Sequence, residues 1–310
     1  MNIYRELSSL NISTPTACGL GNFDGVHLGH QKLIKELVKQ SKIRNLQSTI
    51  LTFEPHPSKI LRSDKADPLL LNLKQKEKII ESFGIDNLVL VPFTREFSKM
   101  NYKDFIYDIL IEKCRARVVL VGFDYRFGYK GEGTAHVLED ICRAEGIDTV
   151  VIPPVTYEGR IVSSTLIRSL ISNGDVKKAG AFLGRPFGIQ GTVVYGDAVG
   201  RKLGFPTANI SFSPDIVLPA SGVYAVLVEW QEKTFKGVAN IGTKPTFGKN
   251  HVTLEVHLFN FNQKIYGETI EVFFIDRIRR EVKFDSVSDL ICQVKSDFVK
   301  AKNILDNLSS

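Results

Sequence analysis

The sequence Thr16–His30, TACGLGNFDGVHLGH, joins a short apolar run to a helical pattern through a turn rich in glycine. We predict a strand over Thr16–Leu20 and a helix that begins near Gln31. Glycines let the backbone approach a phosphate closely, and a helix N-terminus offers unpaired N–H groups and positive potential to an anion. This junction is therefore a candidate phosphate site. Its candidate residues are Gly21, Phe23, Asp24, His27, Gly29 and His30.

Other interpretations of this segment stay open. His27 and His30 could merely cap the helix and pack at the turn, which is the usual case for an isolated HxGH. Asp24 could bind a metal or a ribose hydroxyl, or it could stabilise the turn. The glycine spacing misses the dinucleotide-binding fingerprint by one residue, which weakens the hypothesis of a hydride-transfer enzyme.

Outward from this junction, the first part of the chain alternates short apolar strands with amphipathic helices. The strand candidates are Thr49–Phe53, Asn87–Val91, Val118–Val121 and Thr149–Ile152, and the helix candidates are Gln31–Gln40, Leu73–Phe83, Tyr102–Cys114 and Ala135–Glu145. This alternation predicts a parallel sheet with helices on both faces.

After about Leu183, strand candidates follow one another without long helices between them. They are Gly188–Tyr195, Val223–Trp230, Phe235–Ile241, Thr253–Phe259 and Thr269–Ile275, and Val287–Leu308 follows as a closing amphipathic helix. This pattern predicts an antiparallel sheet or barrel. We therefore expect two domains, residues 1–183 and residues 184–310.

The composition is that of an ordinary soluble protein, with 43% hydrophobic and 24% charged residues and no apolar run near the roughly 20 residues that span a bilayer. The first residues show no targeting pattern, so we expect a cytoplasmic protein without membrane contact. The four cysteines lie far apart without a CxxC pair, which argues against a metal cluster or disulfide framework. The net charge of +6 suits polyphosphates or nucleic acid, and composition does not choose between them.

The string Ser163–Arg168, SSTLIR, offers hydroxyls and a guanidinium at another helix start. Alone, Ser-Ser-Thr is more often a simple N-cap. Paired with HxGH, it resembles the nucleotidyltransferase superfamily, which implies a Rossmann-like α/β fold. Thr52–Pro57 (TFEPHP) and Val121–Gly128 (VGFDYRFG) narrow the resemblance to the FMN adenylyltransferase module of bacterial FAD synthetases.

This resemblance implies that ATP phosphates are held by His27, His30, Ser163, Ser164, Thr165 and Arg168. It also implies that the GxDxRFG segment, with Asp124, helps to form the nucleotide and flavin site; family members often have Phe where Tyr125 stands. The implied reaction is attack by an FMN phosphate oxygen on the α-phosphorus of ATP. Because that nucleophile is already anionic, the site needs positioning and charge stabilisation more than a base.

The string Gly191–Asn209, GTVVYGDAVGRKLGFPTAN, joins a strand to a glycine loop that could wrap phosphates through Gly200, Lys202 and Gly204. Thr207 and Asn209 alternate, so in an extended segment both face one side, where a hydroxyl and an amide oxygen can coordinate Mg²⁺. The alternative is that Pro-Thr-x-Asn makes a simple turn.

Three later strings, Gly237–Gly242 (GVANIG), Leu254–Leu258 (LEVHL) and Ile278–Phe284 (IRREVKF), resemble the riboflavin kinase family when taken with GFPTAN. The resemblance implies a small antiparallel β-barrel in which Glu255 is the catalytic base and Arg279 lies near the flavin. It also implies that Thr207 and Asn209 meet Mg-ATP. A base is needed here because the riboflavin 5′-hydroxyl is neutral.

The leading hypothesis is a bifunctional transferase that phosphorylates riboflavin to FMN and then adenylylates FMN to FAD, with ATP as co-substrate and Mg²⁺ as cofactor. Its expected partners are these small molecules and not nucleic acid, and we expect a monomer or weak oligomer. Two alternatives stay open: a chain that retains only one activity, and a flavin-sensing protein that acts through nucleic acid. His136, His251 and His257 have no partner visible in the sequence and are interpreted as structural or surface residues.

Overall fold

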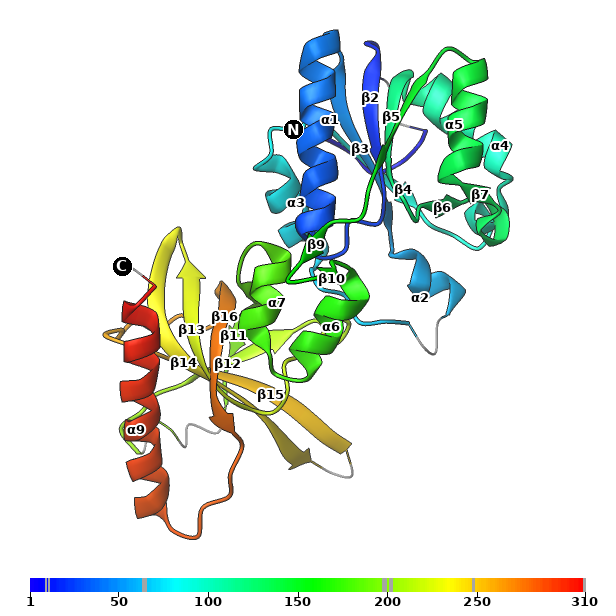
Figure 1. The fold of residues 1–310 in the computed structure, drawn as a ribbon. Coiled ribbons are helices and arrows are strands. Elements are labelled where there is room, and N and C mark those ends of the chain that lie inside the picture. The colour runs from blue at the N-terminus through cyan, green and yellow to red at the C-terminus, as the bar shows by residue number, and fades with distance from the viewer. Residues whose placement is uncertain are drawn as a thin grey trace. The chain divides into compact units, whose positions relative to one another are not determined.

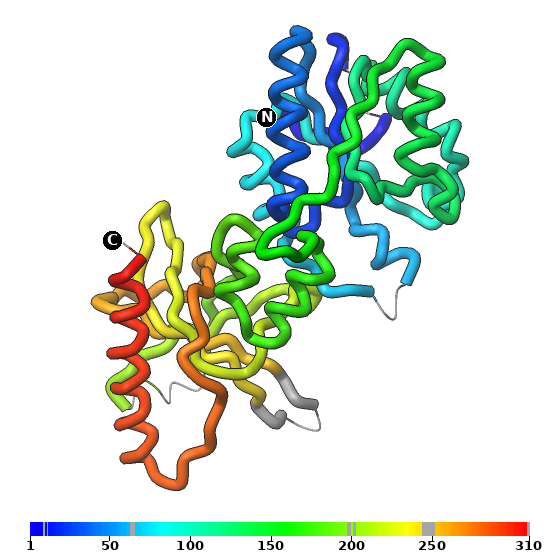
Figure 2. The backbone as a smooth tube through the Cα atoms, viewed as in Figure 1, coloured from blue at the N-terminus to red at the C-terminus, as the bar shows by residue number. Residues whose placement is uncertain are grey.

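The computed structural model describes residues 1–8, 10, 12–62, 66–196, 200, 203–246 and 249–308. The chain forms two compact units, whose elements are drawn in Figures 1 and 2. Met1–Asp67 and Leu73–Ser163 make up the first unit, and Pro68–Asn72 and Ser164–Ser310 make up the second. Within the described residues, no helix is both long and apolar enough to cross a membrane.

A parallel sheet of six strands is the centre of the first unit, in the order β1-β4-β3-β2-β5-β8. The strands are β1 (Asn2–Tyr4), β2 (Thr16–Leu20), β3 (Gln47–Glu54), β4 (Asn87–Pro92), β5 (Ala116–Gly122) and β8 (Asp148–Ile152). The predicted parallel sheet is confirmed. The edge strand β1 adds to the five strands that the sequence predicted, and β2 lies in the interior of the sheet with every residue buried.

Helices connect these strands. They are α1 (Leu28–Arg44), α2 (Pro57–Leu61), α3 (Leu73–Glu81), α4 (Tyr102–Asp104), which runs directly into the π-helical segment η3 (Phe105–Lys113), and α5 (Ala135–Ala144). Short additions are η2 (Phe97–Lys99), η4 (Tyr129–Gly131) and the strand pairs β6 (Arg126–Phe127) with β7 (Gly133–Thr134) and β9 (Thr156–Tyr157) with β10 (Arg160–Ile161).

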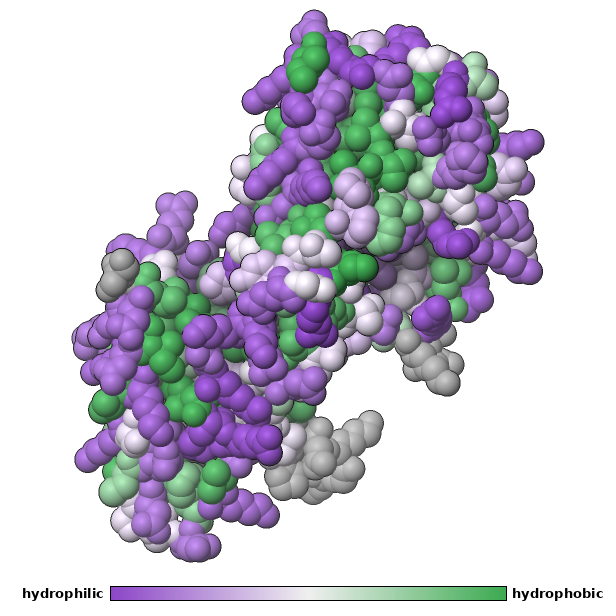
Figure 3. Space-filling model, viewed as in Figure 1, coloured by the Kyte–Doolittle hydropathy of each residue, from purple (hydrophilic) through white to green (hydrophobic). Residues whose placement is uncertain are grey.

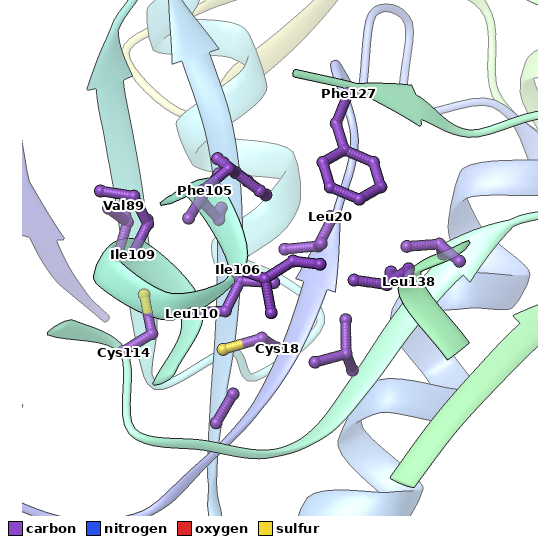
Figure 4. Close-up of a cluster of buried hydrophobic side chains, with 14 of the residues drawn as sticks. Cys18, Leu20, Val89, Phe105, Ile106, Ile109, Leu110, Cys114, Phe127 and Leu138 are labelled. Carbon is purple, nitrogen blue, oxygen red and sulfur yellow. The ribbon is translucent and has the colours of Figure 1, made fainter. Parts of the chain in front are cut away.

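Helices cover both faces of this sheet, as predicted. Side chains on β2 alternate between the faces, and Cys18 and Leu20 pack in a buried cluster with residues of η3 and α5 (Figure 4). Gly19 faces the other way, and a β-carbon there would lie 3.0 Å from the side chains of Leu33 and Leu37 on α1. Glycine at this position therefore lets α1 pack close to the sheet.

The second unit contains a closed barrel of six antiparallel strands, in the order β11-β12-β15-β14-β13-β16. Its strands are β11 (Phe187–Val194), β12 (Ala208–Phe212), β13 (Gly222–Trp230), β14 (Lys233–Thr246), β15 (Lys249–Leu258) and β16 (Thr269–Arg280). The predicted barrel is confirmed, and β12 is an additional strand. The closing helix α9 (Val287–Asp306) buries Ala301 and Leu305 against the barrel. Hydrophilic residues cover most of the face of the molecule that Figure 3 shows.

Two helices, α6 (Ser164–Ser172) and α7 (Val176–Leu183), precede the barrel and pack with it in the second unit. The turn between them is held by Arg277 of β16, whose Nη1 donates to the Asn173 carbonyl at 3.4 Å. Gly184 ends α7 in the left-handed region, with φ of 71°. The domain boundary that we expect at this glycine stays a prediction. The compact second unit already includes the two helices that precede the glycine.

The side chain of Tyr125 yields a stability prediction. Its ring stacks on Phe127 at 5.6 Å between ring centres, and its buried hydroxyl receives no hydrogen bond from any of the described residues. Burial raises the pKa of this hydroxyl. Because an unpaired buried polar group costs about 1–3 kcal/mol, Tyr125→Phe should raise the free energy of unfolding of the first unit by about 1 kcal/mol, as measured by urea denaturation.

The matched control is Tyr107→Phe, which removes an exposed hydroxyl that donates to Glu145 at 3.0 Å. This change should alter stability by less than about 0.5 kcal/mol. A Tyr125→Phe protein that is clearly less stable than the parent would show that the hydroxyl has a partner in the folded protein.

Candidate active sites

The turn after β2 has an unusual backbone. Phe23, Gly25 and Val26 all have positive φ, at 50°, 83° and 39°, and the Val26 N–H donates to the Phe23 carbonyl at 3.2 Å. This conformation is unfavourable for a β-branched residue such as valine, so packing must hold it. The side chains of Phe23 and Val26 are completely buried, which supplies that packing.

His27 caps α1, and His30 packs against it. The His30 N–H donates to Nδ1 of His27 at 3.4 Å, and the two rings stack with their centres 3.7 Å apart. A β-carbon on Gly29 would lie 3.1 Å from Cε1 of His27. Glycine at this position therefore leaves room for the His27 ring. His27 and His30 therefore do cap the helix and pack at the turn. These contacts hold both rings at the N-terminus of the helix, where an anion is favoured.

The sheet topology brings a second predicted segment to the same edge. From β2 the chain proceeds to β3 and β4 on one side, and then crosses to β5 and β8 on the other. In such sheets ligands bind beyond the carboxyl ends of the strands where the order reverses. Gly21–His30 follows β2, and Phe123 and Asp124 follow the neighbouring β5, so both segments lie at that point. Asp124 is exposed there.

Lys76 on α3 is a residue that sequence analysis missed. Its side chain is buried, and Nζ donates to the Asn22 carbonyl at 3.1 Å, which also accepts from the Thr52 hydroxyl at 3.1 Å. Burial lowers the pKa of Lys76, while the carboxylates of Asp24 and Glu54 act to raise it. The ammonium thus stabilises the turn through the Asn22 carbonyl. It also places a positive charge near the buried carboxylate of Asp24.

In the barrel, three predicted residues come together. Glu255 of β15 lies directly across from Asn209 of β12, and the Thr207 hydroxyl donates to Oε2 of Glu255 at 3.4 Å. Asn240 of β14 lies across from Glu255 on the other side, so three polar residues form a row over three strands. Asn240 belongs to the GVANIG string, but nothing in the sequence showed that it faces Glu255.

Gly196 and Gly200, which precede β12, approach this row closely. A β-carbon on Gly196 would lie 2.2 Å from Nδ2 of Asn209, and one on Gly200 would lie 3.3 Å from the Thr207 hydroxyl. Gly204 adopts a φ of 85°, which allows the turn into Phe205–Asn209. Lys202 lies outside the described residues.

Comparison with known proteins assigns the two parts of the chain to families. Residues 10–166 match the FAD synthetase family, and residues 183–305 match the riboflavin kinase family. A bifunctional riboflavin kinase/FMN adenylyltransferase of Buchnera aphidicola from Schizaphis graminum is 40% identical over 96% of both chains. The chain belongs to the bifunctional riboflavin kinase/FMN adenylyltransferase family. The protein of that name from Bacillus subtilis is 38% identical over 93% of this chain and 92% of its own.

A solved structure shows the same fold. A protein from Streptococcus pneumoniae, described as a macrolide-efflux protein, has a TM-score of 0.89 and 35% sequence identity to this chain, covering 97% of this chain and 98% of its own. The two family matches leave residues 167–182 between them, which contain most of α6 and all but the end of α7.

The second motif of the adenylyltransferase module is divided between the units. Ser163 ends the first unit, and Ser164, Thr165 and Arg168 belong to the second, where Nε of Arg168 donates to the Pro68 carbonyl at 2.7 Å. The approach of these side chains to the histidines of the first unit therefore stays a prediction.

Arg279 of the kinase module makes an ion pair with helix α9. Its Nε donates to both carboxylate oxygens of Asp297, at 3.1 and 2.9 Å, and the side chains are 18% and 2% exposed. Gln293 also donates to Asp297, at 2.8 Å. This pairing gives Arg279 a structural role that the sequence did not indicate, and its expected place near the flavin stays a prediction.

Breaking this buried pair should be costly. We expect Asp297→Ala to lower the free energy of unfolding of the kinase module by about 3–5 kcal/mol, because Arg279 would keep its charge in a buried place without its partner. Urea denaturation measures the loss.

Asp306→Ala is the matched control on the same helix. Asp306 accepts from Lys236 at 2.7 Å, but both side chains are exposed. Its removal should cost about 0–1 kcal/mol. Similar losses for the two variants would contradict the difference in burial on which the prediction rests.

Proposed function

We propose that this enzyme makes FAD in two steps that use magnesium-bound ATP. The riboflavin 5′-oxygen bonds to the γ-phosphorus of ATP and ADP leaves; an oxygen of the FMN phosphate then bonds to the α-phosphorus of a second ATP and pyrophosphate leaves. The observation that supports the first assignment best is the contact of Thr207 with Glu255, across from Asn209.

In the kinase step, Glu255 is the proposed acceptor of the hydroxyl proton. It is half-buried and accepts from the Thr207 hydroxyl, so it is held in place while still open to solvent on one side. Thr207 and Asn209 offer a hydroxyl and an amide oxygen, hard ligands that suit Mg²⁺, which keeps several waters and binds substrate phosphates. The ion, when bound, neutralises charge on the transferred phosphate.

In the adenylyl step, the protein supplies position and positive potential. The N-terminus of α1 and the stacked rings of His27 and His30 are proposed to contact the ATP phosphates, with Gly21 and Gly29 allowing close approach. Ser163, Ser164, Thr165 and Arg168 are proposed to complete the site. Asp124 is proposed to line the nucleotide and flavin side, and the buried Phe23 to serve it by holding the backbone of the turn. Gly200, Lys202, Gly204 and Arg279 are proposed to serve ATP and flavin in the kinase module.

The remaining proposals concern the surroundings of the enzyme. We expect it to act in the cytoplasm, where ATP is available, as a monomer or weak oligomer. Its proposed partners are small phosphorylated ligands, and its basic residues are interspersed with acidic ones and do not form a long basic stripe.

Glu255→Gln should reduce FMN formation by about 10²- to 10⁴-fold, because it removes the proton acceptor with little change in volume. Conversion of FMN to FAD should stay near normal. Both products are followed by separating flavins after incubation with riboflavin, ATP and Mg²⁺. Glu229→Gln, a half-buried carboxylate on β13 of the same barrel, is the control. FMN formation within a few-fold of the parent would place the base elsewhere.

His30→Ala should slow conversion of FMN to FAD by about 10²- to 10³-fold, the usual cost of losing one charge-stabilising donor. Riboflavin phosphorylation should be unchanged, since His30 belongs to the first unit. The control is His136→Ala on α5, whose side chain is 82% exposed. A folded His30→Ala protein with full FAD output would contradict the assignment, and thermal melting establishes the fold.

A further inference from the structure

His257 lies two residues after Glu255 on β15, so the two side chains extend from the same face of the strand. Its Nδ1 atom is 2.8 Å from the carbonyl oxygen of Pro206. A carbonyl oxygen only accepts hydrogen bonds, so Nδ1 carries the proton and donates. Among the described residues, this is a direct side-chain link from β15 to the segment that presents Thr207.

The hydrogen bond between His257 and Pro206 lies at the point where the pairing of β12 with β15 ends. β12 pairs with β15 through Asn209 with Glu255 and Ala208 with Val256, and the same register would next bring Thr207 opposite His257. Pro206 has no N–H and cannot extend the ladder. The imidazole takes over by binding the Pro206 carbonyl, which shares one rigid peptide plane with the Thr207 nitrogen.

The ring of His257 is itself fixed by helix α9. It lies flat on Phe298, with ring centres 4.5 Å apart and an angle of 7° between the planes. Phe298 also meets Phe205 edge-on, with ring centres 5.3 Å apart, so one aromatic side chain contacts His257 and the residue next to Pro206. Burial lowers the pKa of His257, which favours the neutral imidazole.

We propose that His257 is a positioning residue of the kinase site, which sets Thr207 against Glu255 by holding the Pro206–Thr207 peptide to β15. This inference rests on the proposed roles of Thr207 and Glu255 and adds a residue to them. A purely packing role would need only the ring, whereas the hydrogen bond needs the donor at the δ position. The two can be separated by substitution.

Two variants of the full-length protein make this separation. His257→Phe keeps a ring for Phe298 and removes the donor, whereas His257→Asn keeps an N–H donor near the position of Nδ1 and removes the stack. For His257→Phe, we expect kcat/KM for ATP in FMN formation to fall by about 10- to 100-fold, the effect of displacing a positioned group. We expect His257→Asn to retain most of this activity. Conversion of FMN to FAD is the internal control, and His136→Phe is the surface control.

Two further measurements do not depend on turnover. Hydrogen exchange of the backbone amide of Thr207 should be faster in His257→Phe than in the parent and in His257→Asn. In the parent protein, nitrogen NMR should show the imidazole of His257 as the neutral tautomer protonated at Nδ1. Thermal melting establishes that each variant is folded.

The proposal is overturned if His257→Phe matches the parent in kcat/KM and exchange, since the ring alone would then be sufficient. It is also overturned if His257→Asn loses as much activity as His257→Phe, since keeping the donor would then restore nothing. If His257→Phe fails to fold, the tautomer decides: protonation at Nε2 overturns the proposal, and protonation at Nδ1 with a slowly exchanging proton supports it. Failure of the proposed function would appear separately, as normal FMN formation by Glu255→Gln.

Discussion

The kinase module depends on the pairing of β12 with β15. β12 lies between β11 and β15 in the closed order of strands, and it meets β15 through Ala208, Asn209 and Ile210. Without this short contact the barrel would be open between β12 and β15. The same segment carries Thr207 and Asn209 to Glu255. Closing the barrel and assembling the candidate site are therefore one structural event, which ties the chemistry to the stability of the fold.

In the adenylyltransferase module, close packing at two glycines positions the candidate site. Gly19 lets Leu33 and Leu37 of α1 reach the sheet, and Gly29 leaves room for the ring of His27. Neither glycine has a positive φ, so the reason for both is space and not backbone freedom. Helix α1 thus begins beside the end of β2, where its first N–H groups point toward the ligand edge of the sheet.

Local patterns predicted the architecture of both units, because strand and helix periodicity is present in each short segment. They did not predict what depends on distant partners. β12 is a short strand with polar residues, and its pairing is visible only in the register with β15. Lys76 lies in the predicted amphipathic helix Leu73–Phe83, whose pattern gives no sign that this lysine is buried. Its Nζ donates to the Asn22 carbonyl in the interior of the first unit. His257 was interpreted as a structural or surface residue, and its contacts with Pro206 and Phe298 could not be seen because both residues are remote in sequence.

The two candidate sites differ in the way their chemistry requires. A phosphate nucleophile that approaches a triphosphate already brings negative charge, so the adenylyl site needs positive potential more than a proton acceptor. Asp24 in the first module is 2% exposed and has the ammonium of Lys76 nearby, which offsets its charge. In the second module the nucleophile is a neutral hydroxyl, and there Glu255 stands half-buried on a strand with Thr207 and Asn209 around it. One carboxylate is therefore buried within its turn beside an ammonium, whereas the other stays half-buried beside two polar side chains, which suits the charge proposed for each nucleophile.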